Sequence, residues 1–476
     1  MNKIIYILIL CTISAACAPK VNYQPPQLVV PEKWDETQAK EIKPTSEEDV
    51  RWWRYFKDPQ LDALIKQAAA SNLDLRQADS RLREVRALRG AVEADLSPQV
   101  NAGTSYSRNR RSQNAAVIAG GRTGGGFSSR LDYNFYQAGF DASWEIDIYG
   151  QAKHLVEAAQ ADMEAVQEAR RGIMISLLAE VSRNYIEFRG LQQQISIVGK
   201  NLKIQQDFFL LTKVRLEAGL GNDLDVSRAE SQVSLTLAQI PTLEIAQKRA
   251  AHRLAILIGL DPGALWSELS PIKDLPITPD EVLVGLPADL MRRRPDLRQS
   301  ERELAAAFAK SQASYADLYP QLTLTGNLGF QSTDISTLLQ WPSKFWSFGP
   351  SLRFPLFNAG RIRSNIKTQV ARQEQALIRY EQTLLTAMEE VENALTAYVR
   401  EQKHRYHLED ARSANCRALD LAQELYLNGL SDFFPVLDAE RSLYSVESQL
   451  AQSRSAVLSN LVAVYKSLGG GWEAME

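Results

Sequence analysis

The chain contains one sequence pattern twice, and this repeat constrains its fold more than any other feature. In the first part of the pattern the two copies are 222 residues apart, as in the match of Leu73–Gln77 with Pro295–Gln299. Further along they are 210 residues apart, as in the match of Gly219-Leu220 with Gly429-Leu430. A long internal repeat indicates two copies of one structural unit.

The boundaries of the repeat predict the organisation of the chain. We expect a first copy at residues 61–260 and a second copy at 283–469. A linker at 261–282 separates them, and a short tail at 470–476 follows the second copy.

The change of offset places twelve extra residues of the first copy between positions 107 and 140. This window holds Arg108-Asn109-Arg110-Arg111 and a glycine-rich stretch. Length variation belongs in loops, so we predict a loop here in both copies. Glycines beside arginines could cradle a phosphate, but the Gly-Lys-Ser/Thr ending of a P-loop is absent. We therefore interpret the stretch as a solvated loop.

The N-terminus has the features of a secretory signal peptide. Lys3 precedes a mostly apolar run, Ile4 to Ile13, which is too short to cross a bilayer as a helix. Small residues then lead to Cys17, in an order that resembles a bacterial lipobox. We therefore expect a signal peptide at 1–16, a covalent lipid on Cys17 and an anchored segment at 17–60. Ordinary signal cleavage near residue 16 is the alternative.

The composition excludes several classes of protein. Cys17 and Cys416 are the only cysteines after residue 16, so no disulfide framework is available. The 54 Lys and Arg residues stand against 57 Asp and Glu residues, which argues against nucleic acid as a partner. No later stretch is apolar for 18 residues, so we expect no transmembrane helix. Ala18 after the lipobox cysteine favours the outer membrane over the inner one.

Four segments alternate between apolar and polar residues, which predicts strands with one apolar and one polar face. A soluble β-sandwich would show the same alternation. The rest of the chain, however, reads as helical and offers no second sheet. Segments of about ten residues suit tilted membrane strands, and aromatics such as Trp144 and Trp346 suit a lipid-facing wall. The predicted strands lie at about 97–107, 139–149, 320–331 and 346–357.

Four strands cannot close a membrane barrel alone, because the smallest known kind needs about eight. Open sheet edges in lipid would leave backbone groups unpaired, at a cost of several kcal/mol each. We therefore expect several copies of the chain to share one barrel.

Each copy also contains a very long helix. Apolar residues recur with an average spacing near 3.6, the α-helical period, over 150–216, and the second copy has its counterpart at 360–428. Each helix would extend on the order of 100 Å. Return helices are predicted at 224–258 and 434–468, and shorter helices at 61–93 and 295–316 lead into the first strand of each copy. Glycines at the turns suit a left-handed helix cap. The apolar stripe itself we interpret as coiled-coil packing.

This order of elements after a lipid-anchored cysteine resembles the TolC-like outer-membrane factors. The resemblance covers nearly the whole mature chain and is strongest to the lipoprotein branch that serves RND pumps, the NodT type. It is carried by Arg293–Arg298, by Trp144–Gly150 and by the Gly-Leu turns. It implies a mainly α fold with a small β part: four transmembrane strands per chain, a trimeric twelve-stranded barrel in the outer membrane, and a periplasmic α-helical barrel of coiled coils.

The resemblance also implies a function. The protein is expected to be a passive exit duct for small toxic compounds, not an enzyme. Its periplasmic tips would dock on an adaptor protein coupled to an inner-membrane RND pump. The tip residues are Gly219, Leu220, Gly429 and Leu430.

Members of this family close their periplasmic end with rings of aspartate and with links between neighbouring coiled coils. By position relative to the turn glycines, Asp438 matches a ring aspartate, and Asp225 and Tyr426 match a carboxylate and a tyrosine of the links. A ring of identical carboxylates attracts cations and repels itself, so small helix movements change access.

Two positions depart from the family pattern. Pro435 stands where a second ring aspartate can occur, and Ser431 stands where a linking arginine can occur. Asp223 and Asp432 are candidates to compensate. The alternative is that such aspartates are exposed turn and N-cap residues.

The chain lacks motifs for catalysis or for cofactors other than the lipid on Cys17. His404, His407 and Glu409 could form a metal site on one helix, although a solvated helix surface is the simpler interpretation. Cys416 is a lone thiol that we expect to be packed. Energy for transport must then come from a partner protein.

Three other functions stay open. The same fold serves as the exit duct of ABC-driven type I protein secretion, and it could serve heavy-metal efflux. A structural envelope spacer without a pore is a third alternative, but the polar strand faces argue against it.

Overall fold

Both sequence copies contribute to each of the two units into which the chain folds. The structure, a computed structural model, describes residues 23–26, 30–35, 42–44, 51–110, 112, 132–278, 282–284 and 287–475. The sheet unit takes Met1–Pro25, Glu84–Glu164 and Arg302–Leu377. The hairpin unit takes Pro26–Arg83, Ala165–Glu301 and Ile378–Glu476.

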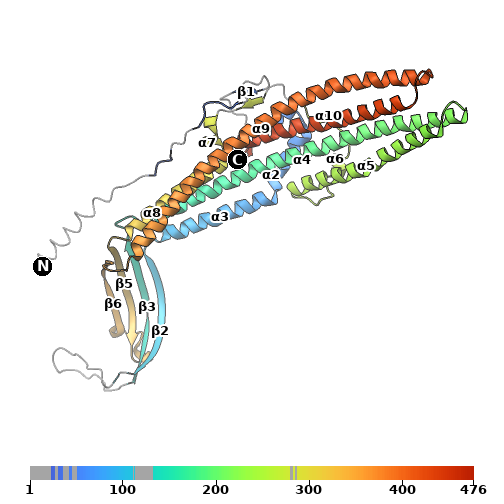
Figure 1. Cartoon of the computed structure of the whole chain (residues 1–476). Coiled ribbons are helices and arrows are strands. Elements are labelled where there is room, and N and C mark those ends of the chain that lie inside the picture. The colour runs from blue at the N-terminus through green and yellow to red at the C-terminus, as the bar shows by residue number, and fades with distance from the viewer. Residues whose placement is uncertain are drawn as a thin grey trace, which may run out of the picture. The chain divides into compact units, whose positions relative to one another are not determined.

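Four antiparallel strands form the sheet of the first unit, in the order β2-β3-β5-β6 (Figure 1). Within the chain β2 and β6 are therefore edge strands, each paired on one side only. The strands are β2 (Gln99–Arg110), β3 (Asp132–Ile146), β5 (Gln321–Ser332) and β6 (Lys344–Arg353).

The register separates the two faces of the sheet. One row across the strands is apolar, and its members are Ala102, Phe140, Leu328 and Trp346. The adjacent row faces the other side and is polar, with Asn101, Asp141, Asn327 and Ser347. Phe140, Leu328 and Trp346 are each more than half exposed. A soluble sandwich would cover such a face, so that alternative does not describe this chain.

The strand ends differ from the sequence expectation. β2 continues to Arg110, so Arg108 and Arg110 belong to a strand and not to the predicted loop. They extend the ladder by pairing with Asn134 and Asp132 of β3. The alternation of apolar and polar residues stops before Arg108, which is why the pattern did not reveal the extra pairs.

Two further strands, β3 and β6, also differ from the predicted bounds, and each difference has a local cause. β3 begins at Asp132, earlier than the predicted start at 139, because it pairs with the extended β2. It ends at Ile146, before the predicted end at 149, and Asp147 instead accepts a hydrogen bond from the backbone N–H of Lys153 at the start of the next helix (2.8 Å). β6 ends at Arg353, and Pro355 beyond it lacks the N–H that a ladder requires.

Two helical hairpins carry most of the remaining chain. The first pairs α4 (Gln151–Glu217) with α5 (Asp223–Leu257), and the second pairs α9 (Arg361–Leu427) with α10 (Phe434–Ser467) (Figure 1). A mainly α fold with a small β part is thereby confirmed. Among the described residues, no helix is both apolar enough and long enough to span a bilayer.

The predicted helix at 61–93 is two helices, and the break has a structural cause. Asn72 separates α2 (Pro59–Ser71) from α3 (Leu73–Ala94). Its Nδ2 donates to the Leu257 carbonyl at 2.8 Å, and its Oδ1 accepts from the Leu75 backbone at 2.9 Å. Asn72 therefore caps α3 and also ties it to the end of α5.

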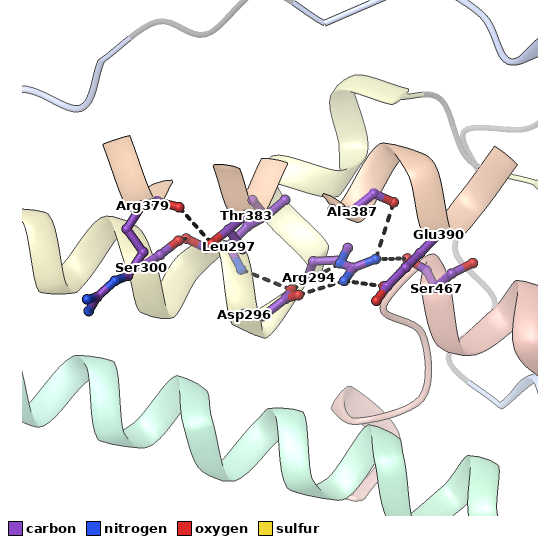
Figure 2. A network of polar contacts seen from close by, with 9 residues as sticks. All are labelled: Arg294, Asp296, Leu297, Ser300, Arg379, Thr383, Ala387, Glu390 and Ser467. Atoms are coloured by element: carbon purple, nitrogen blue, oxygen red, sulfur yellow. Dashed lines mark hydrogen bonds and ion pairs between the residues drawn. The ribbon is translucent and has the colours of Figure 1, made fainter. Parts of the chain in front are cut away.

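The second copy makes the same connection with a different side chain. Arg294 precedes α8 (Pro295–Ala316), 222 residues after Asn72, and donates to the Ser467 carbonyl at 3.0 Å. Figure 2 shows the guanidinium reaching three helices, since it also binds Asp296 (2.6 Å) and Glu390 (2.7 Å). Arg294 of the Arg-Arg-Pro-Asp motif thus connects the end of α10 to α8 and α9.

The predicted linker at 261–282 contains structure of its own. A short helix α6 (Trp266–Leu269) lies within it, and β4 (Val282–Val284) at its end pairs in parallel with β1 (Ile42–Pro44). Fully buried Arg189 donates to the Leu269 and Pro271 carbonyls at 3.0 and 2.9 Å. These bonds fasten the linker to α4. The remaining short elements are η3 (Trp52–Phe56), η4 (Pro287–Asp289), α7 (Leu290–Arg293), η5 (Ile335–Thr337), η6 (Trp341–Ser343) and η7 (Glu473–Met475).

Replacing Gly259 by alanine should destabilise the hairpin unit. Gly259 has φ +75°, and a Cβ there would lie 2.7 Å from the Ser71 carbonyl oxygen. Backbone strain and this clash together should cost about 2 kcal/mol or more. The measurement is the urea midpoint of the helical circular dichroism of the solubilised protein. Gly263→Ala is the matched control, because its Cβ would meet open space; equal midpoints for the two variants would contradict this account.

Candidate gate at the tips of the helical hairpins

Both hairpins turn through the same glycine-dependent cap. Gly219 has φ +70°, and the N–H of Leu220 donates to the Arg215 carbonyl at 2.8 Å. In the second hairpin Gly429 has φ +72°, and Leu430 donates to the Leu425 carbonyl at 2.9 Å. A bond from the third residue after the helix to the third-last residue of the helix, across a left-handed glycine, is the Schellman motif.

Each turn presents an apolar side chain outward. Leu220 is 71% exposed and Leu430 is 75% exposed. A β-carbon added at either turn glycine would meet nothing within 4 Å. Among the described residues, therefore, no other segment covers the two turns, and their leucines are available to a partner.

The helices that follow the turns begin differently. Asn222, and not Asp223, caps α5 by accepting a hydrogen bond from the backbone of Asp225 at 2.8 Å. Phe433 precedes α10 and provides no side-chain cap, while Pro435 occupies the first turn. The positive end of the α5 dipole stabilises acidic residues such as Asp223 and Asp225 nearby.

Tyr426 lies where the two hairpins meet. It is 5% exposed, and its ring packs at 5.4 Å from the ring of Phe433. The guanidinium of Arg215 lies 4.6 Å from the ring centre, and its Nη1 donates to the Tyr426 carbonyl at 3.4 Å. The first hairpin thus holds the second through an arginine.

Asp225 acts on the same tyrosine. Burial raises the pKa of the Tyr426 hydroxyl above its ordinary value, the charge of Arg215 lowers it, and the charge of Asp225 raises it again. The structure therefore brings together two of the sequence-predicted gate residues, Tyr426 and Asp225.

Arg215 is a residue that sequence reasoning missed. The family pattern directed attention to position 431, which is Ser431 here, and offered no reason to look on α4. Arg215 stands four residues before the turn glycine Gly219, and only the packing of the two hairpins places it on Tyr426.

The other predicted gate residues lie on the surface of the chain. Asp223, Asp432 and Asp438 are all exposed. Such an arrangement fits turn residues, and for Asp438 it also fits a carboxylate that faces identical neighbours in an assembly.

Tyr426 belongs to a small buried apolar cluster. Phe433 is its largest fully buried member, and the ring of Phe208 on α4 lies 6.1 Å from it. The cluster takes residues from both hairpins: Ala229, Leu419, Tyr426, Phe433, Val436 and Leu437.

Beyond this cluster the hairpins meet through polar groups. Glu440 of α10 is 3% exposed, and burial raises the pKa of its carboxyl to about 7, while Gln205 of α4 lowers it. The Gln205 amide faces the carboxylate without good hydrogen-bond geometry. Oε1 of Glu440 and both amide atoms of Gln205 lack a partner in the described part of the chain. An unsatisfied buried carboxylate favours the protonated form.

One further polar contact joins the hairpins. The Tyr444 hydroxyl of α10 donates to Oε1 of Gln239 on α5. Tyr444 and Gln239 also line a cavity of about 340 Å³ between α4, α5 and α10. This contact joins α5 of the first hairpin to α10 of the second.

The remaining predicted sites contribute no further chemistry. Cys17 lies outside the described residues. Cys416 is half-buried with a free thiol, and Nδ1 of His404 contacts Glu401 at 3.2 Å. Across the residues that the structure describes, no group of three or more His, Cys, Asp or Glu side chains could hold a metal ion.

Comparison with known proteins gives consistent similarities. The family model "Outer membrane efflux protein" matches residues 64–260 and 286–470. The chain is 31% identical to Nodulation protein T of Rhizobium leguminosarum bv. viciae, over 97% of this chain and 92% of that one. It is 30% identical to the probable outer membrane lipoprotein SilC of Salmonella typhimurium, over 95% of each. The solved outer-membrane channel OprN superposes with a TM-score of 0.89 at 35% identity, covering 96% of this chain and 100% of that one.

The buried carboxyl of Glu440 should make stability depend on pH. Its pKa is raised from 4.5 to about 7, so the folded state holds a proton that the unfolded state releases. This contribution is fully present below pH of about 4.5 and is lost as pH rises through about 7. Glu440→Gln should flatten the dependence and stabilise the protein at pH 8 by on the order of 2 kcal/mol.

Urea unfolding at a series of pH values checks this prediction. Glu424→Gln, at an exposed position of α9, is the control and should keep the wild-type slope. If Glu440→Gln keeps that slope as well, the buried carboxyl is not its source.

Proposed function

The chain belongs to the outer membrane efflux protein family, and from this premise we propose how its own residues build and close the duct. The protein is the outer-membrane channel of a tripartite RND-type efflux pump. It is a passive exit path for small toxic compounds from the periplasm to the exterior. The observation that carries the proposal is a four-stranded sheet with an uncovered apolar face and two unpaired edges.

Three copies of the chain supply twelve strands for one barrel. The edge β2 of one copy pairs with the edge β6 of the next, so every edge gains a partner. The apolar row through Phe140 and Leu328 faces lipid, and the polar row through Asn101 and Asp141 faces the channel. An acylated Cys17 adds a second attachment to the outer membrane.

The helical hairpins form the periplasmic tunnel and its gate. In the closed state Arg215 and Asp225 of the first hairpin hold Tyr426 of the second. Asp438 of each copy faces its equivalents across the threefold axis and narrows the pore. This arrangement replaces the link for which Ser431 is unsuited, and it leaves a single aspartate ring because Pro435 cannot contribute a carboxylate.

The turns are the docking surface for the periplasmic adaptor. Exposed Leu220 and Leu430 supply apolar anchors, and the Schellman caps hold them rigidly. A partner that binds both turns of one copy would separate the hairpins and release Tyr426. The adaptor in turn couples the duct to the inner-membrane pump.

The cargo is decided upstream of this chain. We expect small toxic compounds in general to fit the duct. A deletion strain exposed to dyes, antibiotics and metal salts separates drug efflux from heavy-metal efflux, and retention of a secreted protein would instead indicate type I secretion.

Removing the gate contacts should open the channel. We expect Asp438→Ala combined with Tyr426→Phe to raise the single-channel conductance in planar bilayers several-fold, because the ring charge and the tyrosine hydroxyl are both lost. Asp420→Ala, at an exposed position of α9, is the control and should leave conductance unchanged. Unchanged conductance in the double variant would remove both residues from the gate.

A further inference from the structure

Two arginines lie on the lipid-facing side of the sheet. In a strand every second side chain points to the same face, so Arg108 and Arg110 share the side of Ala102, Thr104 and Tyr106. This is also the side of the exposed apolar row. Arg108 and Arg110, which the sequence placed in a solvated loop, are therefore part of the barrel wall.

A lysine on the opposite edge strand has the same orientation. Lys344 begins β6 and stands in one row with Phe330, Ala138 and Thr104, on the apolar side. Its Nζ lies 3.8 Å from the centre of the exposed Trp341 ring. Lys344 thus projects outward from the barrel beside an aromatic side chain.

All three cations lie at strand ends that point the same way, with Lys344 level with Thr104 of β2, four residues before Arg108. β2 leaves the preceding helix at Gln99 and ends at Arg110, and β6 begins with Lys344 and runs back toward the next helix. The cations are therefore at the end that the topology directs away from the helices, which is the extracellular end of the barrel.

The two faces of the sheet carry different charged side chains. At this end of the outer face, Asp132 is the one carboxylate of the four strands, and it lies 3.8 Å from Arg110. Arg108 stands opposite the neutral Asn134. On the polar face, Asp141 and Glu145 lie at other levels. Three cations for one carboxylate leave the outer face positive.

Aromatic side chains place Arg108 and Arg110 at headgroup level. Tyr106 immediately precedes Arg108 on the outer face, and its ring packs 4.9 Å from that of Tyr136. Rings of this kind border the apolar band of membrane barrels, where the chain meets the lipid headgroups. A cation one step beyond them reaches the lipid phosphates with its charged end.

We propose that Arg108 and Arg110 of one copy and Lys344 of the next form a binding site for the phosphate groups of an outer-leaflet glycolipid. The inference rests on the proposed three-copy barrel, because only there do β2 and β6 meet at a seam. The planar guanidinium group of arginine can donate two parallel hydrogen bonds to phosphate oxygens. Alternate residues of a strand are about 6.6 Å apart, so Arg108 and Arg110 can bind separate oxygens of one phosphate or two phosphates. One glycolipid would bind at each of the three seams and hold neighbouring copies together.

The test uses the full-length trimer in detergent and bisphosphorylated lipid A as the probe. Native mass spectrometry counts bound lipids across a titration. Wild type should bind up to three lipid A molecules per trimer. The variant Arg108→Gln/Arg110→Gln/Lys344→Gln should bind at least about tenfold more weakly, since each basic residue near an anionic lipid contributes to affinity. Arg353→Gln is the control, because Arg353 lies at the other end of β6 on the polar face.

Two further arms identify the chemistry that is recognised. Wild type should bind dephosphorylated lipid A weakly, with an affinity no higher than that of the triple variant for intact lipid A. Millimolar inorganic phosphate should not displace the lipid, because the apolar strand face contributes to binding the acyl chains. The proposal would be overturned if wild type and triple variant bound lipid A equally well. It would also be overturned if wild type bound dephosphorylated lipid A as well as it binds lipid A. Displacement by inorganic phosphate would overturn the assignment of the site to a lipid.

Conductance measurements distinguish failure of the proposed lipid site from failure of the proposed channel function. If wild type is trimeric and conducts but the triple variant binds lipid A normally, only the lipid site is wrong. If wild type itself is monomeric and forms no channel, the duct fails and the seam with it.

Discussion

The pairing of backbone groups at the two sheet edges governs the whole molecule. Each copy has hydrogen-bonding groups along the outer sides of β2 and β6 that no other described strand satisfies. In lipid those groups must find partners, because water is absent and each unpaired group costs several kcal/mol. Three copies satisfy all the edges at once and enclose a polar interior. The edges are therefore satisfied in an assembly of copies and not in the single chain.

The helical part combines rigid and movable contacts. Asn72 and Arg294 tie the ends of α5 and α10 to the short helices with buried hydrogen bonds, so these ends of the hairpins are fixed. At the turns, by contrast, the hairpins meet through a small apolar cluster, an arginine on Tyr426 and the poorly satisfied carboxyl of Glu440. Fixed ends and weakly joined tips are what a gate needs, because the tips can separate without loss of the fold.

Sequence patterns predicted the helices and strands more accurately than they predicted the side-chain contacts. The repeat and its two offsets predicted the order of strands and hairpins, since periodicity and glycine turns are local signals. The cap that Asn72 makes with the Leu75 backbone is local, but its second bond joins residues 185 apart, which no local pattern reveals. Arg215 escaped because its partner lies in the other hairpin, and Arg108 escaped because headgroup-level strand residues do not alternate in polarity. Asp438 stays a prediction, since its role depends on neighbouring copies.

Disulfide trapping between β2 and β6 tests the central claim most directly. In a Cys416→Ser background, a cysteine at Ser105 on the polar face of β2 is combined in turn with a cysteine at each polar-face position of β6. Oxidation in outer membranes should yield, for at least one pair, covalent products of two and three chains on a denaturing gel. If every pair gives only single chains, the edges do not meet between copies and the shared barrel is wrong.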